Sequence, residues 1–223
     1  LMSSTYRQSS KANPEKFKQD PENRILARGP RFRLDAESIR DQALAMSGLL
    51  GNQIGGKSVK PYQPAGLWKP VGFGGSNTSV FKQDNGEALY RRSMYTFWKR
   101  TSHPPSMAIF DAPNRETCTV RRERTNTPLQ ALVLMNDVQF FEAARKFGER
   151  AMREGGNGTE ERIMFIFRTA LGRLPSETEK SSILNLYNEQ LKDFSNNNGT
   201  VTEILSTGES DVDKTLNAAE LAS

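Results

Sequence analysis

The sequence predicts a mainly α-helical fold, in which a helical hairpin or small bundle packs on an irregular Gly/Pro-rich region with a small β insertion. Three observations predict it. Apolar residues recur at helical spacing after Pro128. Residues 51–127 are rich in Gly, Pro and Asn, which is typical of loops. Two short apolar runs inside that stretch have the alternation of strands. With 223 residues, the chain is long enough to bury a core.

The N-terminal part is expected to hold one helix. Residues 1–34 are polar and broken by prolines, with a turn at Gly29-Pro30, and they read as a connecting loop. Asp35 can cap a helix over residues 36–50, where apolar residues recur at helical spacing until the glycines from Gly51 onward.

The middle part, residues 51–127, is too rich in Pro and Gly for long helices. Two runs escape these breakers, Tyr90–Arg100 and Ser106–Asp111. Their aromatic and alternating character predicts short strands, which could pair as a two-stranded element.

Helices are predicted in residues 128–194. Thr127 followed by Pro128 is an N-cap with proline at the first helical position, and the helix should run to about Glu154. Its inward stripe is expected to be Leu129, Leu132, Val133, Phe140, Phe141, Ala144 and Phe147. A second helix covers about 160–171. The SETE box at Ser176–Glu179 opens a third helix that ends near Phe194.

The last part, residues 195–223, reads as a flexible loop, SNNNGT, followed by the start of a truncated helix. We therefore predict one domain over residues 1–194, with parts 1–34, 35–127 and 128–194, and a separate tail. The opening LMSSTYRQSS and the closing TLNAAELAS predict a fragment of a longer chain.

Composition excludes several classes of protein. The net charge of +5 is uneven: residues 1–100 hold 17 Lys and Arg against 8 Asp and Glu, and the remainder hold 14 against 18. The basic residues are dispersed and no nucleic-acid-binding signature is present, so no nucleic-acid partner is predicted. No run of about eighteen apolar residues predicts a membrane span. The lone cysteine, Cys118, permits no intrachain disulfide, and no CxxC or Cys/His spacing predicts a metal or covalent haem site.

The most informative stretch is Asp111–Asp137, in which a dense run of Arg, Asn, Thr and Glu leads into a helix. A planar guanidinium group matches sulfate, carboxylate or phosphate, so the arginines could line an anion site. The candidate ligand-binding residues are Arg91, Arg92, Asn114, Arg115, Glu116, Arg121, Arg122, Arg124 and Asn126. The alternative is a structural network, in which these side chains satisfy loop carbonyls and Glu116 and Glu123 neutralise the arginines.

Catalytic machinery is sparse. His103, the only histidine, could transfer a proton because its ordinary pKa lies near neutrality, and Asp111 is a nearby carboxylate. A lone histidine lacks an obvious relay partner in the sequence. Cys118 is expected to be a small buried residue rather than a nucleophile.

Long motifs carry a family resemblance: RILARGPRFRLDAESIRDQALAMSGLL, GGKSVKPYQPAGLW, LYRRSMYTFWKRTSHPPSMAIFDAPNRETCTVRRERTNTPLQALVLMND and LGRLPSETE. Over about residues 1–194 the chain resembles the planctomycete-type domain of unknown function number fifteen fifty-three. The resemblance implies an exported protein, periplasmic or at the cell surface, whose haem c would lie in an upstream cytochrome-like module and in no residue of this segment. It also implies a link to secreted sulfatase-like proteins and sulfated polysaccharide.

Two hypotheses about function follow. In the first, the chain is a structural or docking module of a cytochrome-associated multidomain protein linked to sulfated polysaccharide utilisation. Its partners would be upstream domains of the same chain or a sulfatase-like protein. In the second, it is an enzyme, or part of one, acting on anionic carbohydrate (sulfated or uronate). Its arginines would hold the anion, and His103 or Asp111 would move a proton.

Overall fold

The computed structural model describes residues 2–11 and 13–223. The chain forms two compact units, Leu1–Leu34 and Asp35–Ser223. The first unit contains a short helix, α1 (Pro14–Gln19), inside the segment that we predicted as a connecting loop. Asn13 caps α1 by accepting a hydrogen bond from the Lys16 amide at 2.8 Å, with Pro14 at the first helical position. The missed signal is this Asn-Pro pair.

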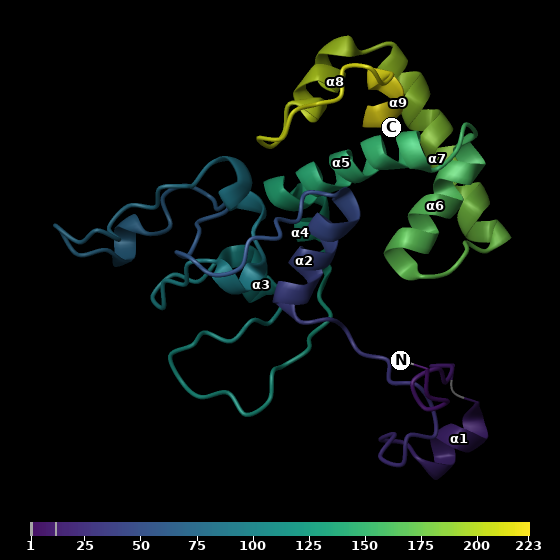
Figure 1. Cartoon of the computed structure of the whole chain (residues 1–223), viewed down its shortest axis with the longest axis horizontal. Helices are drawn as coiled ribbons and strands as arrows, with labels where there is room; N and C mark the ends of the chain where they lie inside the picture. The colour runs from purple at the N-terminus through teal and green to yellow at the C-terminus, as the bar shows by residue number, and fades with distance from the viewer. Residues whose placement is uncertain (1, 12) are drawn as a thin grey trace. The chain divides into compact units, whose positions relative to one another are not determined.

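The second unit is helical and is organised around α5 (Figure 1). This helix contacts α2, α4, α6 and α9. In chain order the helices are α2 (Ala36–Ser47), α3 (Pro105–Ile109), α4 (Pro128–Asn136), α5 (Val138–Glu154), α6 (Thr159–Leu171), α7 (Glu177–Ser195), α8 (Asn198–Leu205) and α9 (Ala218–Ala222). Three short 3-10 helices lie between α2 and α3: η1 (Lys69–Val71), η2 (Gly86–Tyr90) and η3 (Ser93–Tyr95). The mainly α, loop-rich class predicted from the sequence is confirmed.

Two predicted helices end elsewhere. The helix from residue 36 stops at Ser47 rather than residue 50, because Gly48 adopts a left-handed backbone (φ 79°) that ends α2. The helix from Pro128 is interrupted at Asp137, whose extended backbone ends α4. The Asp137 carboxylate then caps α5 by accepting from the Gln139 amide at 3.0 Å.

The predicted strands are not formed. The run Tyr90–Arg100 contains the last residue of η2 and the whole of η3. The run Ser106–Asp111 lies largely in α3. Among the described residues, β pairing consists of isolated bridges, such as Val59 with Thr96. Proline explains part of the difference, since Pro104 and Pro105 start a helix by fixing φ. The predicted loop SNNNGT is also wrong in part, because Asn197 caps α8 there.

Two groups of packed apolar residues position the irregular region of the second unit. Ala36, Met107, Phe110 and Phe140 form a buried cluster that joins α2, α3 and α5. Trp68, which is 1% exposed, packs edge-on against Phe81 and also contacts Phe97, filling the Gly/Pro-rich region.

A buried arginine connects three segments of the second unit. Arg40 on α2 is 2% exposed and donates to the Leu89 carbonyl at 2.7 Å and the Arg91 carbonyl at 2.8 Å. It also donates to the Gln139 side chain on α5 and to the Ser93 hydroxyl. Burial lowers the pKa of Arg40 to about 10, which leaves it charged at neutral pH. The irregular segment around η2 and η3 is therefore held by a guanidinium group instead of a sheet.

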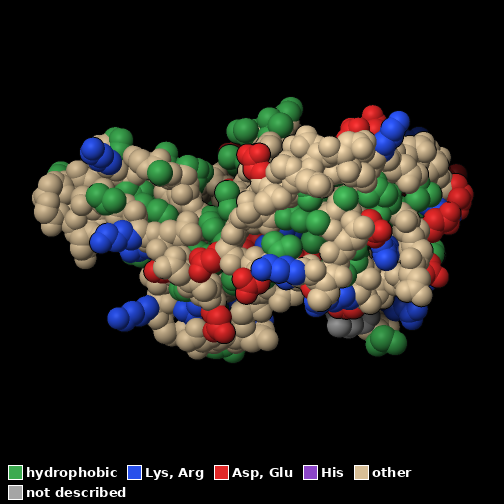
Figure 2. Space-filling model, turned by 90° about the horizontal axis from the view of Figure 1, so that it is seen from above, with side chains coloured by type: hydrophobic (Ala, Val, Ile, Leu, Met, Phe, Trp, Pro, Cys, Tyr) green, Lys and Arg blue, Asp and Glu red, His purple; other side chains and the backbone are tan. Residues whose placement is uncertain are grey.

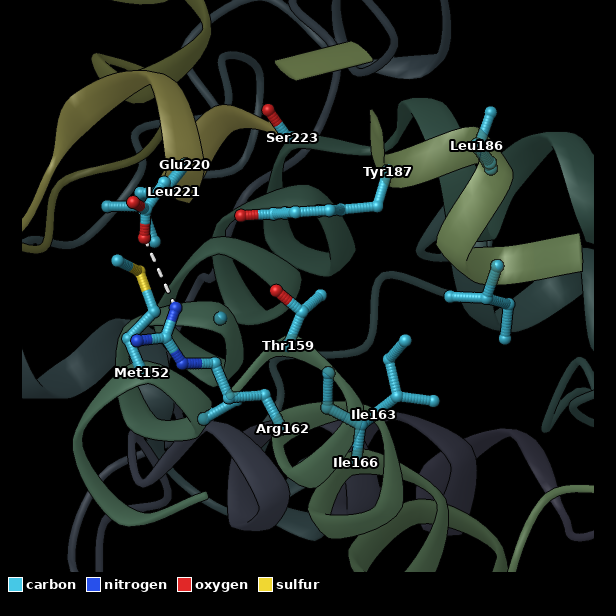
Figure 3. Close-up of a pocket in the computed structure, with 13 residues that line it drawn as sticks. Met152, Thr159, Arg162, Ile163, Ile166, Leu186, Tyr187, Glu220, Leu221 and Ser223 are labelled. Atoms are coloured by element: carbon cyan, nitrogen blue, oxygen red, sulfur yellow. Dashed lines mark hydrogen bonds and ion pairs between the residues drawn. The ribbon is translucent and has the colours of Figure 1, made fainter. Parts of the chain in front are cut away.

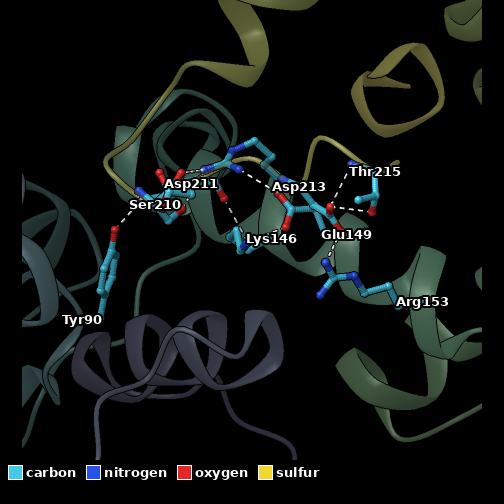
Figure 4. Close-up of polar contacts among 10 residues, drawn as sticks. Tyr90, Lys146, Glu149, Arg153, Ser210, Asp211, Asp213 and Thr215 are labelled. Carbon is cyan, nitrogen blue, oxygen red and sulfur yellow. Dashed lines mark hydrogen bonds and ion pairs between the residues drawn. The ribbon is translucent and has the colours of Figure 1, made fainter. Parts of the chain in front are cut away.

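Residues 206–217, which we call the strap, join α8 to α9. A second polar network holds the strap against α5 (Figure 4). Glu142 on α5 is fully buried and accepts from the Tyr90 hydroxyl at 2.8 Å and the Ser210 amide at 2.6 Å. Arg145, one turn further, donates to the Ser210 carbonyl at 2.7 Å. Gly208 has φ 90°, and a Cβ there would overlap the Glu142 carboxylate, so glycine is required at this position.

Replacing Arg40 by alanine should destabilise the second unit strongly. The change leaves buried carbonyls of Leu89 and Arg91 without their donor, and we expect the free energy of unfolding to fall by about 3 kcal/mol. Denaturant unfolding measures this. Arg92→Ala, at an exposed neighbouring arginine, is the matched control. Equal stability of the two variants would contradict the assigned role.

Replacing Glu142 by alanine should loosen the strap. The Ser210 amide loses its acceptor, so amide hydrogen exchange over residues 206–217 should rise about tenfold or more. Glu203→Ala, at an exposed residue of α8, should leave the exchange unchanged. If the strap exchanges equally in both variants, Glu142 does not hold it.

Candidate functional site

The polar stretch singled out in the sequence forms an exposed loop between α3 and α4, which we call the arginine loop (Asp111–Asn126) (Figure 1). Its two ends are joined at the base. The Asp111 carboxylate accepts from the Thr125 amide at 2.8 Å and from the Thr125 hydroxyl at 2.9 Å. Gln130, buried on α4, donates to the Ile109 carbonyl at 2.9 Å. Asp111, a candidate proton carrier, therefore has a structural contact at the base of the loop.

Arg122 binds the first turn of α2. Its two terminal nitrogens donate to the Glu37 carboxylate at 2.6 and 3.1 Å, and Asp35, the N-cap residue, lies 3.9 Å away. Burial acts to raise the pKa of Glu37, but the Arg122 hydrogen bond and charge lower it overall. The same hydrogen bond raises the pKa of Arg122. Arg122 therefore ties the loop to the body of the protein.

The other loop arginines remain substantially exposed. Arg115 lies over the Trp98 ring at 4.3 Å and 4.0 Å from Glu37, with 44% of its side chain exposed. Arg124 lies 3.9 Å from Asp35 with 47% exposed. Arg121 is also exposed.

Arg91 and Arg92 were also predicted to bind a ligand, but their surroundings differ from those of the loop arginines. Arg91 is 5% exposed and donates to the Lys57 carbonyl at 2.7 Å and to the Gly55 carbonyl. Its guanidinium stacks on the Tyr95 ring at 4.0 Å. It satisfies loop carbonyls, as the structural alternative predicted. Arg92 is exposed.

The candidate ligand-binding residues that are uncharged or acidic either hydrogen-bond to the loop backbone or face solvent. The Asn114 side chain accepts from the Glu116 amide at 3.0 Å, which fixes a local turn. The main-chain carbonyl of Asn114 accepts from the Trp98 indole N–H at 3.1 Å. The side chains of Glu116 and Asn126 are exposed.

His103 and Cys118, the remaining residues considered for a chemical role, lie in different surroundings. His103 is half-buried and its ring lies 5.8 Å from Trp98. Its Nε2 is buried and has no hydrogen-bond partner among residues 2–11 and 13–223. Cys118 is exposed, which corrects our expectation of a buried cysteine. The loop around it is polar and extends into solvent, so no core is available there.

Hollows beside the arginines have a mixed lining. One of about 670 Å³ is lined by Asp35, Arg121, Arg122, Glu123, Arg124 and Thr125. A second, of about 420 Å³, includes Asp111, Asn114, Arg121 and Glu123. Carboxylates among the guanidinium groups reduce the positive potential that an anion would meet.

Sequence reasoning missed an apolar surface on α4. Leu129 and Leu132, predicted to point inward, are 51% and 52% exposed, and Leu134 and Met135 are 45% and 68% exposed. The signal was present: PLQALVLMN is apolar around the whole helix, and only one side can face α5. Exposed hydrophobic side chains are not confined to α4, and the view from above in Figure 2 shows several of them among basic and acidic groups.

Two further properties concern metals and membranes. Within residues 2–11 and 13–223, no group of three or more His, Cys, Asp or Glu side chains is placed to hold a metal ion. In the same ranges, no helix combines the length and apolar character that crossing a bilayer requires.

Residues 1–187 match the family PSD1, described as a protein of unknown function (DUF1553), and the chain belongs to this family. The match includes the arginine loop and most of α7. Comparisons with curated proteins and with solved structures gave no match.

Arg122→Ala should weaken the attachment of the loop in a pH-dependent way. At neutral pH we expect a loss of about 0.5 kcal/mol, because the pair is partly exposed. Glu37 has a folded-state pKa below its ordinary value of 4.5, so the stabilisation is present above that pH and is lost as pH falls through the lowered pKa. The gap between wild type and variant should therefore close in acid. Thermal unfolding from pH 7 to pH 3 measures it, with Arg121→Ala as control; a constant gap would contradict this assignment.

Proposed function

We propose that this chain is a non-catalytic docking module of a larger exported protein. The observation that carries the proposal is the surface formed by the arginine loop and the apolar face of α4. Arg124 stands five residues before Leu129 in the sequence, in the irregular segment that leads into α4, and the Gln130 side chain donates to the Thr125 hydroxyl at 3.2 Å. The end of the loop that carries these cationic groups is therefore anchored to the first turn of the apolar helix.

A protein surface is the partner that this chemistry favours. Exposed leucine and methionine side chains gain free energy by leaving water, and contiguous apolar surface marks interaction sites. Arginine and methionine are enriched at protein interfaces, and arginine supplies binding hot spots. The partner we propose is another domain of the same protein, with an apolar centre and carboxylate groups around it. The family resemblance supports a c-type-cytochrome-associated setting, with haem c in that other module, and a role in using sulfated polysaccharide.

A second candidate is binding of anionic carbohydrate, with or without catalysis. The hollow of about 670 Å³ beside Arg121 and Arg124 favours it, since both guanidinium groups are exposed there. Asp35 and Glu123 in the same lining oppose it. In this candidate, the sulfatase-like protein implied by the resemblance would act on the same polysaccharide.

The docking proposal predicts protection of residues 113–135 in the intact protein. Amide hydrogen exchange there should be at least tenfold slower in the intact protein purified from its host than in the 223-residue chain alone. Leu132→Asp should remove this protection, because a buried charge is costly in an interface. Leu174→Asp, at a leucine that is 50% exposed elsewhere, is the matched control.

Equal exchange in the intact protein and the isolated chain would rule out docking at this surface. The carbohydrate candidate has its own readout, retention of the chain on a sulfated-glycan array. Retention that is lost in an Arg121→Ala, Arg124→Ala double variant would favour that candidate instead.

A further inference from the structure

A small apolar pocket lies among α5, α6, α7 and α9, remote in sequence from the arginine loop (Figure 3). Its volume is about 200 Å³. The apolar lining comes from all four helices: Ala151, Met152, Ile163, Ile166, Ile183, Leu186 and Leu221. An apolar cavity of about 150 Å³ is already large enough to hold a benzene ring. The pocket can therefore hold one ring-sized group.

The polar groups of the pocket are few and converge on its centre. Figure 3 shows the Tyr187 ring extending across the pocket, above Thr159 and opposite Glu220 and Leu221. Arg162 donates to the Glu220 carboxylate at 3.2 Å. Burial and the Glu220 charge raise the pKa of Tyr187, so its phenol keeps its proton at neutral pH. The hydroxyls of Tyr187 and Thr159 interact with each other, and because a hydroxyl can both donate and accept, each can make a further hydrogen bond.

The helix that closes the pocket is held by close packing. Gly148 on α5 faces Leu221 on α9, and a Cβ at this glycine would lie 3.4 Å from the Leu221 Cδ1 atom. An added Cβ would thus be at ordinary van der Waals distance, so α9 packs closely on α5 here without a strict need for glycine. Leu186, which is 56% exposed, lies at the open side of the pocket. A ligand would enter past this leucine.

We propose that this pocket binds a small uncharged aromatic alcohol. The volume sets the size at one ring. The Arg162–Glu220 pair is already neutral, so a charged ligand would bring an unpaired charge into an apolar lining. The Tyr187 ring and the Met152 sulfur both favour an aromatic partner over an aliphatic one. The ligand hydroxyl would bond to Tyr187 and Thr159. This site is independent of the proposed docking surface.

The test uses benzyl alcohol as the probe, with the 223-residue chain and saturation-transfer NMR. Binding should be in the millimolar range, as expected for so small a ligand, on the order of 1 mM. Benzoate and benzylammonium, which differ in charge, and cyclohexylmethanol, which lacks the aromatic ring, should each bind at least fivefold more weakly.

Two variants locate the site. Leu186→Trp places bulk at the entrance and should weaken binding at least tenfold, whereas Leu174→Trp, at a similarly exposed leucine outside the pocket, should leave it unchanged. Tyr187→Phe keeps the ring, removes the hydroxyl and should weaken benzyl alcohol several-fold without loss of the helical circular dichroism signal. The proposal is overturned if benzyl alcohol does not bind, if Leu186→Trp binds it as the wild type does, or if benzoate binds equally well.

Discussion

Most of the second unit depends on the hydrogen bonds that the buried guanidinium group of Arg40 donates. It reaches carbonyls and side chains of η2, η3 and α5 from within α2, and nearly all of its surface is removed from water. Apolar burial alone could not fix these segments, because the chain between α2 and α3 has few regular hydrogen bonds and must find partners for its carbonyls. By fixing α2, Arg40 also fixes Glu37, the acceptor that holds Arg122 of the arginine loop.

The helices were largely predictable because their signals are local. Pro128 and Ser176 each start a helix as their residue types require. Asp35 stands at the N-cap position of α2, but its side chain makes no capping hydrogen bond and lies near Arg122 and Arg124. The break at Asp137 needed the capping role of that aspartate to be weighed against the apolar pattern. The strands were mispredicted because alternation in Tyr90–Arg100 reflects contacts with Arg40 and Trp68, which come from distant sequence. The buried polar face of α5, which includes Glu142 and Arg145, could not be predicted from the sequence, because polar residues at helical spacing ordinarily indicate a solvent-exposed face.

The arginine loop combines the two alternatives drawn from its sequence. Arg122 in the loop, like Arg91 outside it, donates hydrogen bonds to structural partners. Arg115 and Arg124 lie within 4.0 Å of a carboxylate but remain substantially exposed, and Arg121 is exposed. Residue type alone could not show which arginines form hydrogen bonds within the protein, because these bonds depend on Glu37 and on the carbonyls of residues 53–57. The loop leads directly into α4, whose leucine and methionine side chains are exposed. The docking proposal depends on these apolar side chains, since a sulfated sugar offers little apolar surface to leucine and methionine.

Many of the hydrogen bonds that Arg40 and Arg91 donate go to main-chain carbonyls, and every amino acid has a main-chain carbonyl. The segment from Gln53 to Lys57 gives Arg91 only main-chain carbonyls, so Gln53, Ile54 and Lys57 can change their side chains without losing these acceptors. Gly55 and Gly56 are different, because φ values of 78° and 86° favour glycine there. The two arginines have no such freedom, because lysine cannot reproduce a planar fork that reaches several acceptors. Mutational tolerance in this region should thus be strongly unequal, with side chains at Gln53, Ile54 and Lys57 permissive and with Arg40, Arg91, Gly55 and Gly56 intolerant.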